Sequence, residues 1–239
     1  MVNFFSLCEY FSRDKESKKT NMKKPNLILI GPPGSGKGTF TQTLKKFDYV
    51  SLSTGNLLRE IIEENSNLGI KCKTFINKGK LVPDDIIFNL IDQKIKFFLK
   101  DENPFVLDGF PQSFKQYQYI LDLLKKEKMK EDVWFLEFII DNNKAIERMK
   151  SRLFCLECHQ IYNKNTNPPH KKYICDICQT TLSIRSTDNQ ADAQKRLDLY
   201  YKITKPILSL AKKEFKYLRI NSNFEYNDML YINFILHMF

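Results

Sequence analysis

Short apolar runs of strand length alternate with segments of helical periodicity along most of the chain. The runs cover 26–30, 105–108, 134–140 and 217–220, and each fits a buried strand. Strands that alternate with helices predict an α/β fold, with a mostly parallel sheet and helices on both faces. A Gly-rich turn and a helix at about 36–47 follow the first strand. The apolar runs fall short of the roughly 18 to 20 residues of a membrane span, so no membrane association is expected.

The segment 153–188 interrupts this alternation. It carries two pairs of cysteines, the dipeptide Pro168-Pro169 and several polar turns. Such a segment does not continue a sheet of buried strands. We interpret it as a small domain inserted into the α/β core.

Residues 1–24 precede the first strand and are predicted to be a disordered N-terminal extension. They lack the long apolar core of a signal peptide. Phe4, Leu7 and Phe11 share one helical face and basic residues follow, as in organelle-targeting segments, whereas Glu9 and Asp14 argue against targeting. We therefore expect a cytoplasmic protein, with a mitochondrial location as the alternative.

The composition is that of a globular protein with a basic surface. The chain has 239 residues, of which 42% are hydrophobic and 28% charged, and this excludes disordered, collagen-like and disulfide-scaffold proteins. The formal net charge is +10. A positive surplus suits phosphate-bearing ligands, but it also fits a lysine-rich soluble protein. Charge alone therefore assigns no partner.

The Gly-rich turn at 31–39 carries the first candidate chemistry. It reads G-P-P-G-S-G-K-G-T and contains four of the eight glycines of the chain. A G-x-x-x-x-G-K motif between a strand and a helix is typical of a phosphate-binding loop, so the fold is predicted to be of the P-loop NTPase type. Lys37 would move with the transferred phosphoryl group. The predicted donor-nucleotide residues of the loop are Gly34, Ser35, Gly36, Lys37, Gly38 and Thr39.

The loop departs from its motif at one position that bears on magnesium. Gly38 stands where a Ser or Thr usually ligates Mg²⁺, and Thr39 comes one residue later. The ion must then be held by nucleotide oxygens, water and a carboxylate elsewhere. Asp108, which ends the second buried strand, lies where an open α/β sheet binds its ligands. We predict that Asp108 holds Mg²⁺ through water.

The two cysteine pairs have the spacing of a zinc ribbon. Cys155 and Cys158 form one C-x-x-C pair, and Cys175 and Cys178 form the second, 16 residues further on. Four thiolates around tetrahedral Zn²⁺ make a structural site, which has no open position for chemistry. We predict a structural zinc ion that keeps this small insert folded, and a reducing compartment. His159 and His170 are interpreted as surface residues and not as ligands.

Four arginines bracket the insert. Arg148 and Arg152 are spaced i, i+4, which predicts that they share a face of a helix entering the insert. Arg185 leaves the insert, and Arg196 follows on the next helix. Phosphoryl transfer needs fixed positive charge more than a general base. Lys37, Arg148, Arg152, Arg185 and Arg196 are therefore the candidate catalytic residues.

Four ordered motifs carry a resemblance that spans nearly the whole chain. They are the phosphate loop at 31–39, S-T-G-N-L-L-R at 53–59, G-K-L-V at 79–82 and D-G-F-P at 108–111. In this combination the sequence resembles the adenylate kinase family of nucleoside monophosphate kinases. The resemblance implies a core over 25–239, a helical insert at 53–82 that binds the nucleoside monophosphate, and a mobile zinc-bearing lid at 153–188.

The resemblance also implies the activity and the ligands. The protein would be a monomeric kinase that transfers the γ-phosphoryl group of ATP reversibly to AMP, with Mg²⁺, giving two molecules of ADP. Its partners would be these nucleotides and not nucleic acid. Arg148 and Arg152 would contact the donor nucleotide. The residues implied for the AMP site are Thr54, Arg59, Lys80, Leu81, Val82, Gly109, Gln112, Gln116, Arg185 and Arg196.

Two positions depart from the family pattern. Gln112 stands where the family has an arginine that clamps the acceptor phosphate, and Thr187 replaces an acidic residue. The alternatives are therefore a GTP:AMP phosphotransferase and a kinase-like nucleotide-binding protein with weakened catalysis. A zinc-ribbon protein that binds nucleic acid is disfavoured, because 155–178 contains neither arginine nor paired stacking aromatics.

Overall fold

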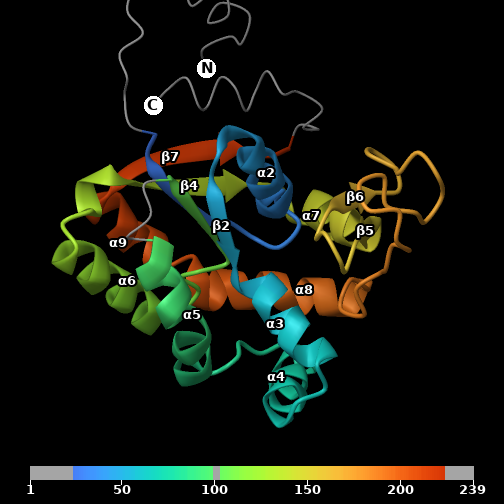
Figure 1. Ribbon diagram of the computed structural model, residues 1–239, viewed down its shortest axis with the longest axis horizontal. Helices are drawn as coiled ribbons and strands as arrows, with labels where there is room; N and C mark the ends of the chain where they lie inside the picture. The colour runs from blue at the N-terminus through green and yellow to red at the C-terminus, as the bar shows by residue number, and fades with distance from the viewer. Residues whose placement is uncertain (1–23, 99–102, 224–239) are drawn as a thin grey trace, which may run out of the picture.

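The computed structural model describes residues 24–98 and 103–223 (Figure 1). Its centre is a parallel sheet in the order β2-β3-β1-β4-β7. All four neighbouring pairs of strands are parallel. The strands are β1 Asn26–Ile30, β2 Val50–Ser53, β3 Phe105–Asp108, β4 Val133–Ile139 and β7 Lys216–Asn221. The predicted α/β fold is confirmed, and so are the four predicted strands. The edge strand β2 was not predicted.

Helices cover both faces of the sheet, as expected. They are α2 Lys37–Leu44, α3 Thr54–Glu63, α4 Asn67–Asn77, α5 Asp84–Phe98, α6 Phe114–Lys126, α7 Asn142–Lys150, α8 Gln190–Leu199 and α9 Ile207–Glu214. Short 3₁₀ turns follow at Lys45–Phe47 and Lys130–Asp132, and a π turn at Tyr200–Thr204. The predicted helix at 36–47 is thus α2 and its 3₁₀ extension.

The alternation of side chains in β1 divides the core into two layers. Ile28 and Ile30 pack on the side of α5, α6 and α9, whereas Leu27 and Leu29 pack on the side of α2. All five residues of β1 are buried, as in a central parallel strand. Because the strands are parallel, their carboxyl ends share one edge of the sheet. The phosphate loop and Asp108 lie at that edge.

Two parts of the chain extend from this edge (Figure 1). The first is the pair α3 and α4, which pack so closely that a Cβ atom on Gly69 would lie 2.1 Å from the carbonyl oxygen of Ile61. The second is residues 153–188, which we call the cysteine unit. With Arg152 it forms the antiparallel strands β5 Arg152–Phe154 and β6 Ile161–Asn163. Its small core contains Leu153, Cys155, Tyr162, Cys175 and Leu182.

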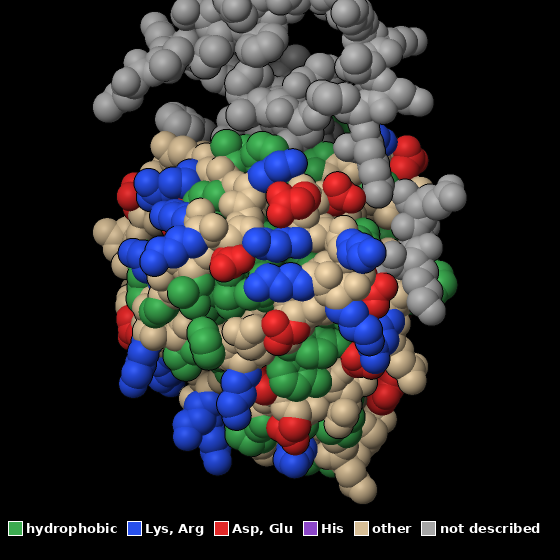
Figure 2. Space-filling model, turned by 90° about the vertical axis from the view of Figure 1, so that its left-hand side faces the viewer, with side chains coloured by type: hydrophobic (Ala, Val, Ile, Leu, Met, Phe, Trp, Pro, Cys, Tyr) green, Lys and Arg blue, Asp and Glu red, His purple; other side chains and the backbone are tan. Residues whose placement is uncertain are grey.

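The surface carries charges of both signs. In the face shown by Figure 2, Lys and Arg side chains are interspersed with Asp and Glu. Among the described helices none is long and apolar enough to span a membrane. The predictions for the N-terminal extension fall on residues outside the described part, apart from Lys24, whose ammonium donates to the carbonyl oxygen of Phe47 at 2.8 Å.

Candidate active site

A cavity of about 1260 Å³ lies at the carboxyl edge of the sheet. The phosphate loop, the N-terminal part of α3, the turn at 79–81, the segment 108–112 and the cysteine unit all contribute to its lining. All eight residues predicted for the donor nucleotide line it, namely Gly34, Ser35, Gly36, Lys37, Gly38, Thr39, Arg148 and Arg152. One cavity therefore joins the segments that the sequence singles out.

The phosphate loop has a backbone that only glycine adopts easily at two positions. Gly34 and Gly36 have φ values of 81° and 89°, in the left-handed region. At Gly34 a Cβ atom would also lie 2.4 Å from the carbonyl oxygen of Ala145 on α7. The loop thereby opens directly into α2 and leaves the N-terminus of that helix facing the cavity.

Lys37, the first residue of α2, folds back over the loop. Its Nζ donates to the carbonyl oxygens of Gly31 at 2.7 Å and Pro32 at 2.9 Å, and to Ser35 Oγ at 3.2 Å. Burial lowers the pKa of Lys37 to about 8, although the charge of Asp108 opposes the shift. The ammonium is thus held beside the loop by three oxygens.

Asp108 lies opposite the loop, as predicted for a strand-end carboxylate. A Cβ atom on Gly38 would lie 3.8 Å from Asp108 Oδ2 and 2.7 Å from Ile161 Cδ1 of the cysteine unit. A side chain at position 38 would therefore displace Ile161. Burial raises the pKa of Asp108, while the charges of Lys37 and Arg59 oppose that shift.

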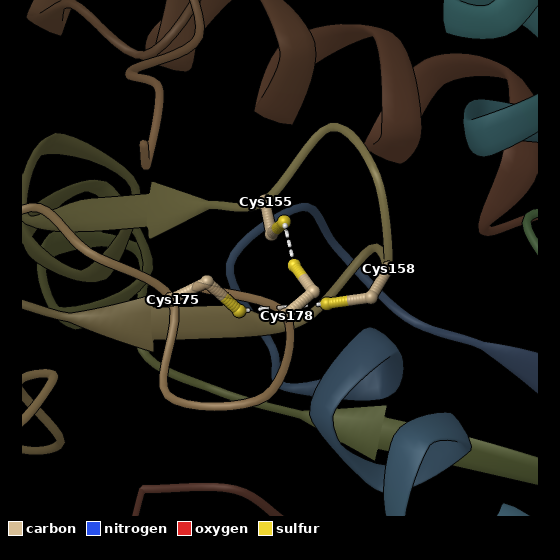
Figure 3. Close-up of side chains that lie close together, drawn as sticks. All are labelled: Cys155, Cys158, Cys175 and Cys178. Atoms are coloured by element: carbon tan, nitrogen blue, oxygen red, sulfur yellow. Dashed lines mark hydrogen bonds between the residues drawn. The ribbon is translucent and has the colours of Figure 1, made fainter. Parts of the chain in front are cut away.

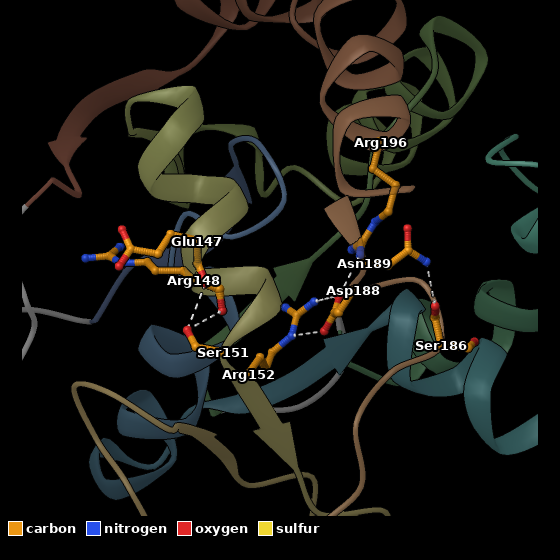
Figure 4. A network of polar contacts seen from close by, with 8 residues as sticks. All are labelled: Glu147, Arg148, Ser151, Arg152, Ser186, Asp188, Asn189 and Arg196. Atoms are coloured by element: carbon orange, nitrogen blue, oxygen red, sulfur yellow. Dashed lines mark hydrogen bonds and ion pairs between the residues drawn. The ribbon is translucent and has the colours of Figure 1, made fainter. Parts of the chain in front are cut away.

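Two of the predicted arginines share a buried carboxylate (Figure 4). Arg152 donates to Asp188 through Nε at 2.8 Å and Nη2 at 2.5 Å, and Arg196 donates through Nη1 at 3.0 Å. The side chain of Asp188 is 0% exposed. Asp188 is a site residue that the sequence analysis missed. An acid three residues after Arg185 was the available signal, since clustered buried arginines need a counter-ion.

The predicted helix face shared by Arg148 and Arg152 is wrong. Helix α7 ends at Lys150 with Ser151 as its C-cap, and Arg152 begins strand β5. In Figure 4 the side chain of Arg148 extends away from the group formed by Arg152, Asp188 and Arg196. Both arginines line the cavity, but from different directions.

Arg59 and Arg185 complete the positive group. Burial lowers the pKa of Arg59 to about 10 and that of Arg185 well below its usual value, and repulsion from Arg152 contributes to both shifts. Arg185 Nε is buried without a hydrogen-bond partner among the described residues. Buried guanidinium groups that repel one another form a site suited to an anion.

The predicted AMP residues lie around the mouth formed by α3, the turn at 79–81 and segment 108–112. Seven of them line the cavity: Arg59, Lys80, Leu81, Gly109, Gln112, Arg185 and Arg196. Thr54, Val82 and Gln116 lie behind the lining. Thr54 Oγ1 donates to the carbonyl oxygen of Gly109 at 2.6 Å, and Val82 is 5% exposed and packs in the core.

Gln116 fixes the backbone of Gln112, the position at which this chain departs from the family pattern. Its Oε1 accepts from the backbone N–H of Gln112 at 2.8 Å, and its Nε2 donates to Asp84 Oδ1 at 2.8 Å. The carbonyl oxygen of Gln112 accepts from Thr204 Oγ1 at 2.9 Å. These bonds fix the backbone of Gln112, whose side-chain amide lies close to Gly109.

Comparison with known proteins agrees with this arrangement. The adenylate kinase family model matches residues 29–216. The chain is 31% identical over 205 residues to adenylate kinase from Thermococcus onnurineus, a match that covers 85% of this chain and 90% of the relative. It is 34% identical over 204 residues to adenylate kinase from Borrelia garinii, covering 85% and 93%.

The chain belongs to the adenylate kinase family. The resemblance drawn from the four motifs is thereby confirmed. Membership in this family makes the protein a nucleoside monophosphate kinase, which transfers phosphoryl groups between nucleoside phosphates.

The structure places the four cysteine sulfur atoms within 4.8 Å of one another (Figure 3). Cys155 and Cys178 are 3.3 Å apart at Sγ, and Cys158 and Cys175 are 3.5 Å apart. Thiolates around tetrahedral Zn²⁺, with Zn–S bonds of about 2.3 Å, are about 3.8 Å apart. The four sulfur atoms therefore fit a zinc ion, and the group could bind a metal.

The two histidines near these cysteines, His159 and His170, are not part of the cluster of four sulfur atoms. His170 Nδ1 is 3.1 Å from Asp176 and its side chain is 94% exposed. His159 Nε2 lies 3.1 Å from Glu60 Oε1 on α3, and its carbonyl oxygen accepts from Gln42 Nε2 on α2 at 3.1 Å. His159 therefore joins the cysteine unit to helices α2 and α3, a contact that the sequence did not indicate.

Proposed function

We propose that this protein catalyses the Mg²⁺-dependent, reversible transfer of the γ-phosphoryl group of ATP to AMP, giving two molecules of ADP. The observation that carries the proposal is the position of the positive charges. One cavity joins the phosphate loop, Arg59 of the predicted AMP side, Arg152 and Arg185 at the two ends of the cysteine unit, and Arg196 on α8.

The phosphate loop would bind the donor nucleotide. Lys37 Nζ now contacts three oxygens of its own loop, and phosphate oxygens would replace some of these acceptors. The helix N-terminus and the backbone N–H groups of the loop would supply the remaining contacts. The transferred group carries charge on three oxygens in the transition state, and Lys37 would stabilise part of it.

The arginines would take the place of a general base. The attacking AMP phosphate is already an anion, so transfer requires positioning and charge stabilisation more than proton removal. Arg59 and Arg185 would hold the acceptor phosphate, and Arg152 and Arg196 the transferred group. Asp188 would keep Arg152 and Arg196 in place, because its carboxylate bonds to both.

The residues around Gly38 fit the bound Mg²⁺ of a nucleotide complex. Magnesium supplies charge neutralisation between the phosphates and keeps several water ligands. Asp108 is the carboxylate that faces the loop beside Gly38, and it would hold the ion through water. Its charge also attracts Lys37, Arg59 and Arg185.

The two projections of the fold would bind and enclose the nucleotides. Residues 53–82, which include α3 and α4, would form the AMP-binding insert. The cysteine unit would form the lid, kept folded by structural Zn²⁺ on its four cysteines. Closing of such a lid excludes water and brings the arginines onto the phosphates.

One observation favours a second candidate function. Gln112 provides a neutral amide where the family pattern has an arginine, which lowers the positive charge at the acceptor phosphate. A kinase-like protein that binds nucleotides but turns over slowly would fit this change. GTP in place of ATP is the alternative donor, because the structural features above contact phosphates and do not select the base.

Initial rates test these assignments. Purified protein is given ATP or GTP as donor and a panel of nucleoside monophosphates, with and without Mg²⁺, and diphosphate formation is measured. We expect the highest kcat/KM with ATP, AMP and Mg²⁺. The control is Lys37→Ala, which removes the loop ammonium and should lose nearly all turnover. Equal rates for wild type and Lys37→Ala would contradict the proposal.

A further inference from the structure

The aromatic ring of Phe154 is buried outside the apolar core. It is 6% exposed, yet it belongs to none of the four clusters of packed apolar side chains formed by the described residues. Its backbone is fixed by two bonds with Ser183, at 3.0 and 2.8 Å. The position of this ring therefore calls for another explanation than core packing.

Strand alternation places Phe154 on the cavity side of β5. Leu153 and Cys155 point into the core of the cysteine unit. Successive side chains of a strand point to opposite faces, so Arg152 and Phe154 share the other face. Both line the cavity. The ring thus belongs to the wall of the site and not to the interior of the unit.

Two guanidinium groups lie over this ring. Arg185 Cζ is 4.9 Å from the ring centroid, and Arg59 Cζ is 5.8 Å from it. Both distances are within the range of cation–π attraction, which is strongest where the groups are desolvated. Arg185 lies near the C-terminal end of the cysteine unit, whereas Arg59 belongs to α3. The ring is therefore shared by arginines from two separate projections of the fold.

These two arginines need such a contact. Burial lowers the pKa of both guanidinium groups, repulsion from Arg152 and Arg196 lowers both further, and Arg59 also lowers the pKa of Arg185. Asp188 bonds to Arg152 and Arg196, while Arg59 donates to the neutral amide of Asn56. Arg185 Nε has no hydrogen-bond partner in the described chain. A carboxylate at this point would hold both arginines but would compete with a phosphate; a ring holds them and leaves their charge available.

We propose that Phe154 is a positioning residue for the acceptor phosphate. Its ring holds Arg59 and Arg185 beside each other, across the contact between α3 and the cysteine unit, so that both guanidinium groups meet the phosphate of the incoming nucleoside monophosphate. The identity of that ligand rests on the proposed function. The same contact links the cysteine unit to the acceptor side, because each arginine comes from one of them.

The test compares Phe154→Leu, which keeps an apolar side chain but removes the ring, with Phe154→Tyr, which keeps the ring. Steady-state kinetics with AMP and ATP are combined with calorimetric titration of AMP alone. For Phe154→Leu we expect KM and Kd for AMP to rise about tenfold, within the range of a desolvated cation–π contact. We also expect kcat to fall severalfold, because Arg185 would contact a phosphate in the proposed function, and KM for ATP to stay within twofold of wild type.

Phe154→Tyr should restore the wild-type values to within about twofold. Zinc content and thermal stability are measured on each variant, because Phe154 is next to Cys155, one of the four clustered cysteines. If Phe154→Leu does not fold, Phe154→Met is used in its place. Equal impairment of Leu and Tyr variants, or an equal rise of KM for both nucleotides, would show a purely structural role and overturn the proposal. Wild-type protein without phosphotransfer would instead refute the proposed function, and the AMP titrations would still decide the role of Phe154.

Discussion

Removal of the charge of Asp188 is the sharpest test of the site's electrostatics. Asp188→Asn keeps the size of the side chain and removes the carboxylate that pairs with Arg152 and Arg196. The Asp188 side chain is 0% exposed, and those of Arg152 and Arg196 are 13% and 28% exposed. The variant therefore leaves two largely desolvated guanidinium groups without their counter-ion, next to the positive charges of Arg59 and Arg185.

Breaking a buried ion pair by removing one partner costs about 3–5 kcal/mol. In a protein of this size each kcal/mol corresponds to about 2–4 °C in Tm, so Asp188→Asn should lower Tm by about 6–20 °C. The measurement is scanning calorimetry in a buffer free of phosphate. ADP should stabilise the variant by more degrees than it stabilises wild type, because its phosphates supply the missing negative charge.

The matched control is Asp192→Asn on α8. Asp192 pairs with Lys195 at 3.0 Å, where the two side chains are 27% and 58% exposed, and solvent screens such a pair. Its Tm should hardly change, with the same ADP stabilisation as wild type. A Tm of Asp188→Asn within about 2 °C of wild type, or an ADP effect no larger than in wild type, would refute the argument that the arginines depend on Asp188.

Four further perturbations address other contacts. Because the pKa of Lys37 is lowered to about 8, the amine loses its proton as pH rises from 7 to 9.5, and the affinity for ATP should fall. Lys37→Arg stays charged, so its affinity for ATP should not depend on pH. Parallel pH curves of ATP affinity for wild type and Lys37→Arg would contradict this. Gln112→Arg should lower KM for AMP by about tenfold, or about 1.4 kcal/mol, with KM for ATP unchanged; a higher KM for AMP would mean that the pocket is built around the amide. Cys175→Ser should reduce the zinc content measured by metal analysis and lower Tm; zinc-free wild-type protein would remove the basis of this expectation. Glu60→Gln weakens the contact between α3 and His159 of the cysteine unit. The cysteine unit should then open faster, which should raise kcat and the KM values for ATP and AMP. A lower kcat would contradict the idea that this contact holds the cysteine unit closed.

The parts of the fold that follow from local pattern were predictable. Buried strands of β-branched and large apolar residues, such as 26–30 and 134–140, are readable because both faces of a parallel sheet are covered. The phosphate loop was readable because four of the eight glycines fall within 31–38, in a G-x-x-x-x-G-K motif. Strand β2 was missed since its sequence V-S-L-S is half polar, and only Leu52 among its residues is buried. An edge strand of this kind resembles a loop in sequence.

The parts of the site that depend on distant partners were not predictable. The spacing of Arg148 and Arg152 suggested one helix, but α7 ends at Lys150 with Ser151 as its C-cap, and Arg152 begins strand β5. Asp188 gains its role only from two arginines, 36 and 8 residues away in sequence. His159 reaches Glu60 across the cavity. The contacts of Asp188 with Arg152 and of His159 with Glu60 join residues far apart in sequence, so the local pattern around each residue does not reveal its partner.

The place of β7 in the sheet has a consequence for folding. Strand β4 pairs with β7 along six residues, and the cysteine unit, α8 and α9 are synthesised between them. Until residue 221 leaves the ribosome, β4 presents an unpaired edge to other chains, which is a known route to aggregation. The entropic cost of closing a loop grows with its length. A cysteine unit that folds early would shorten this loop, so the metal supply of the cell would affect how quickly, and how cleanly, the sheet is completed.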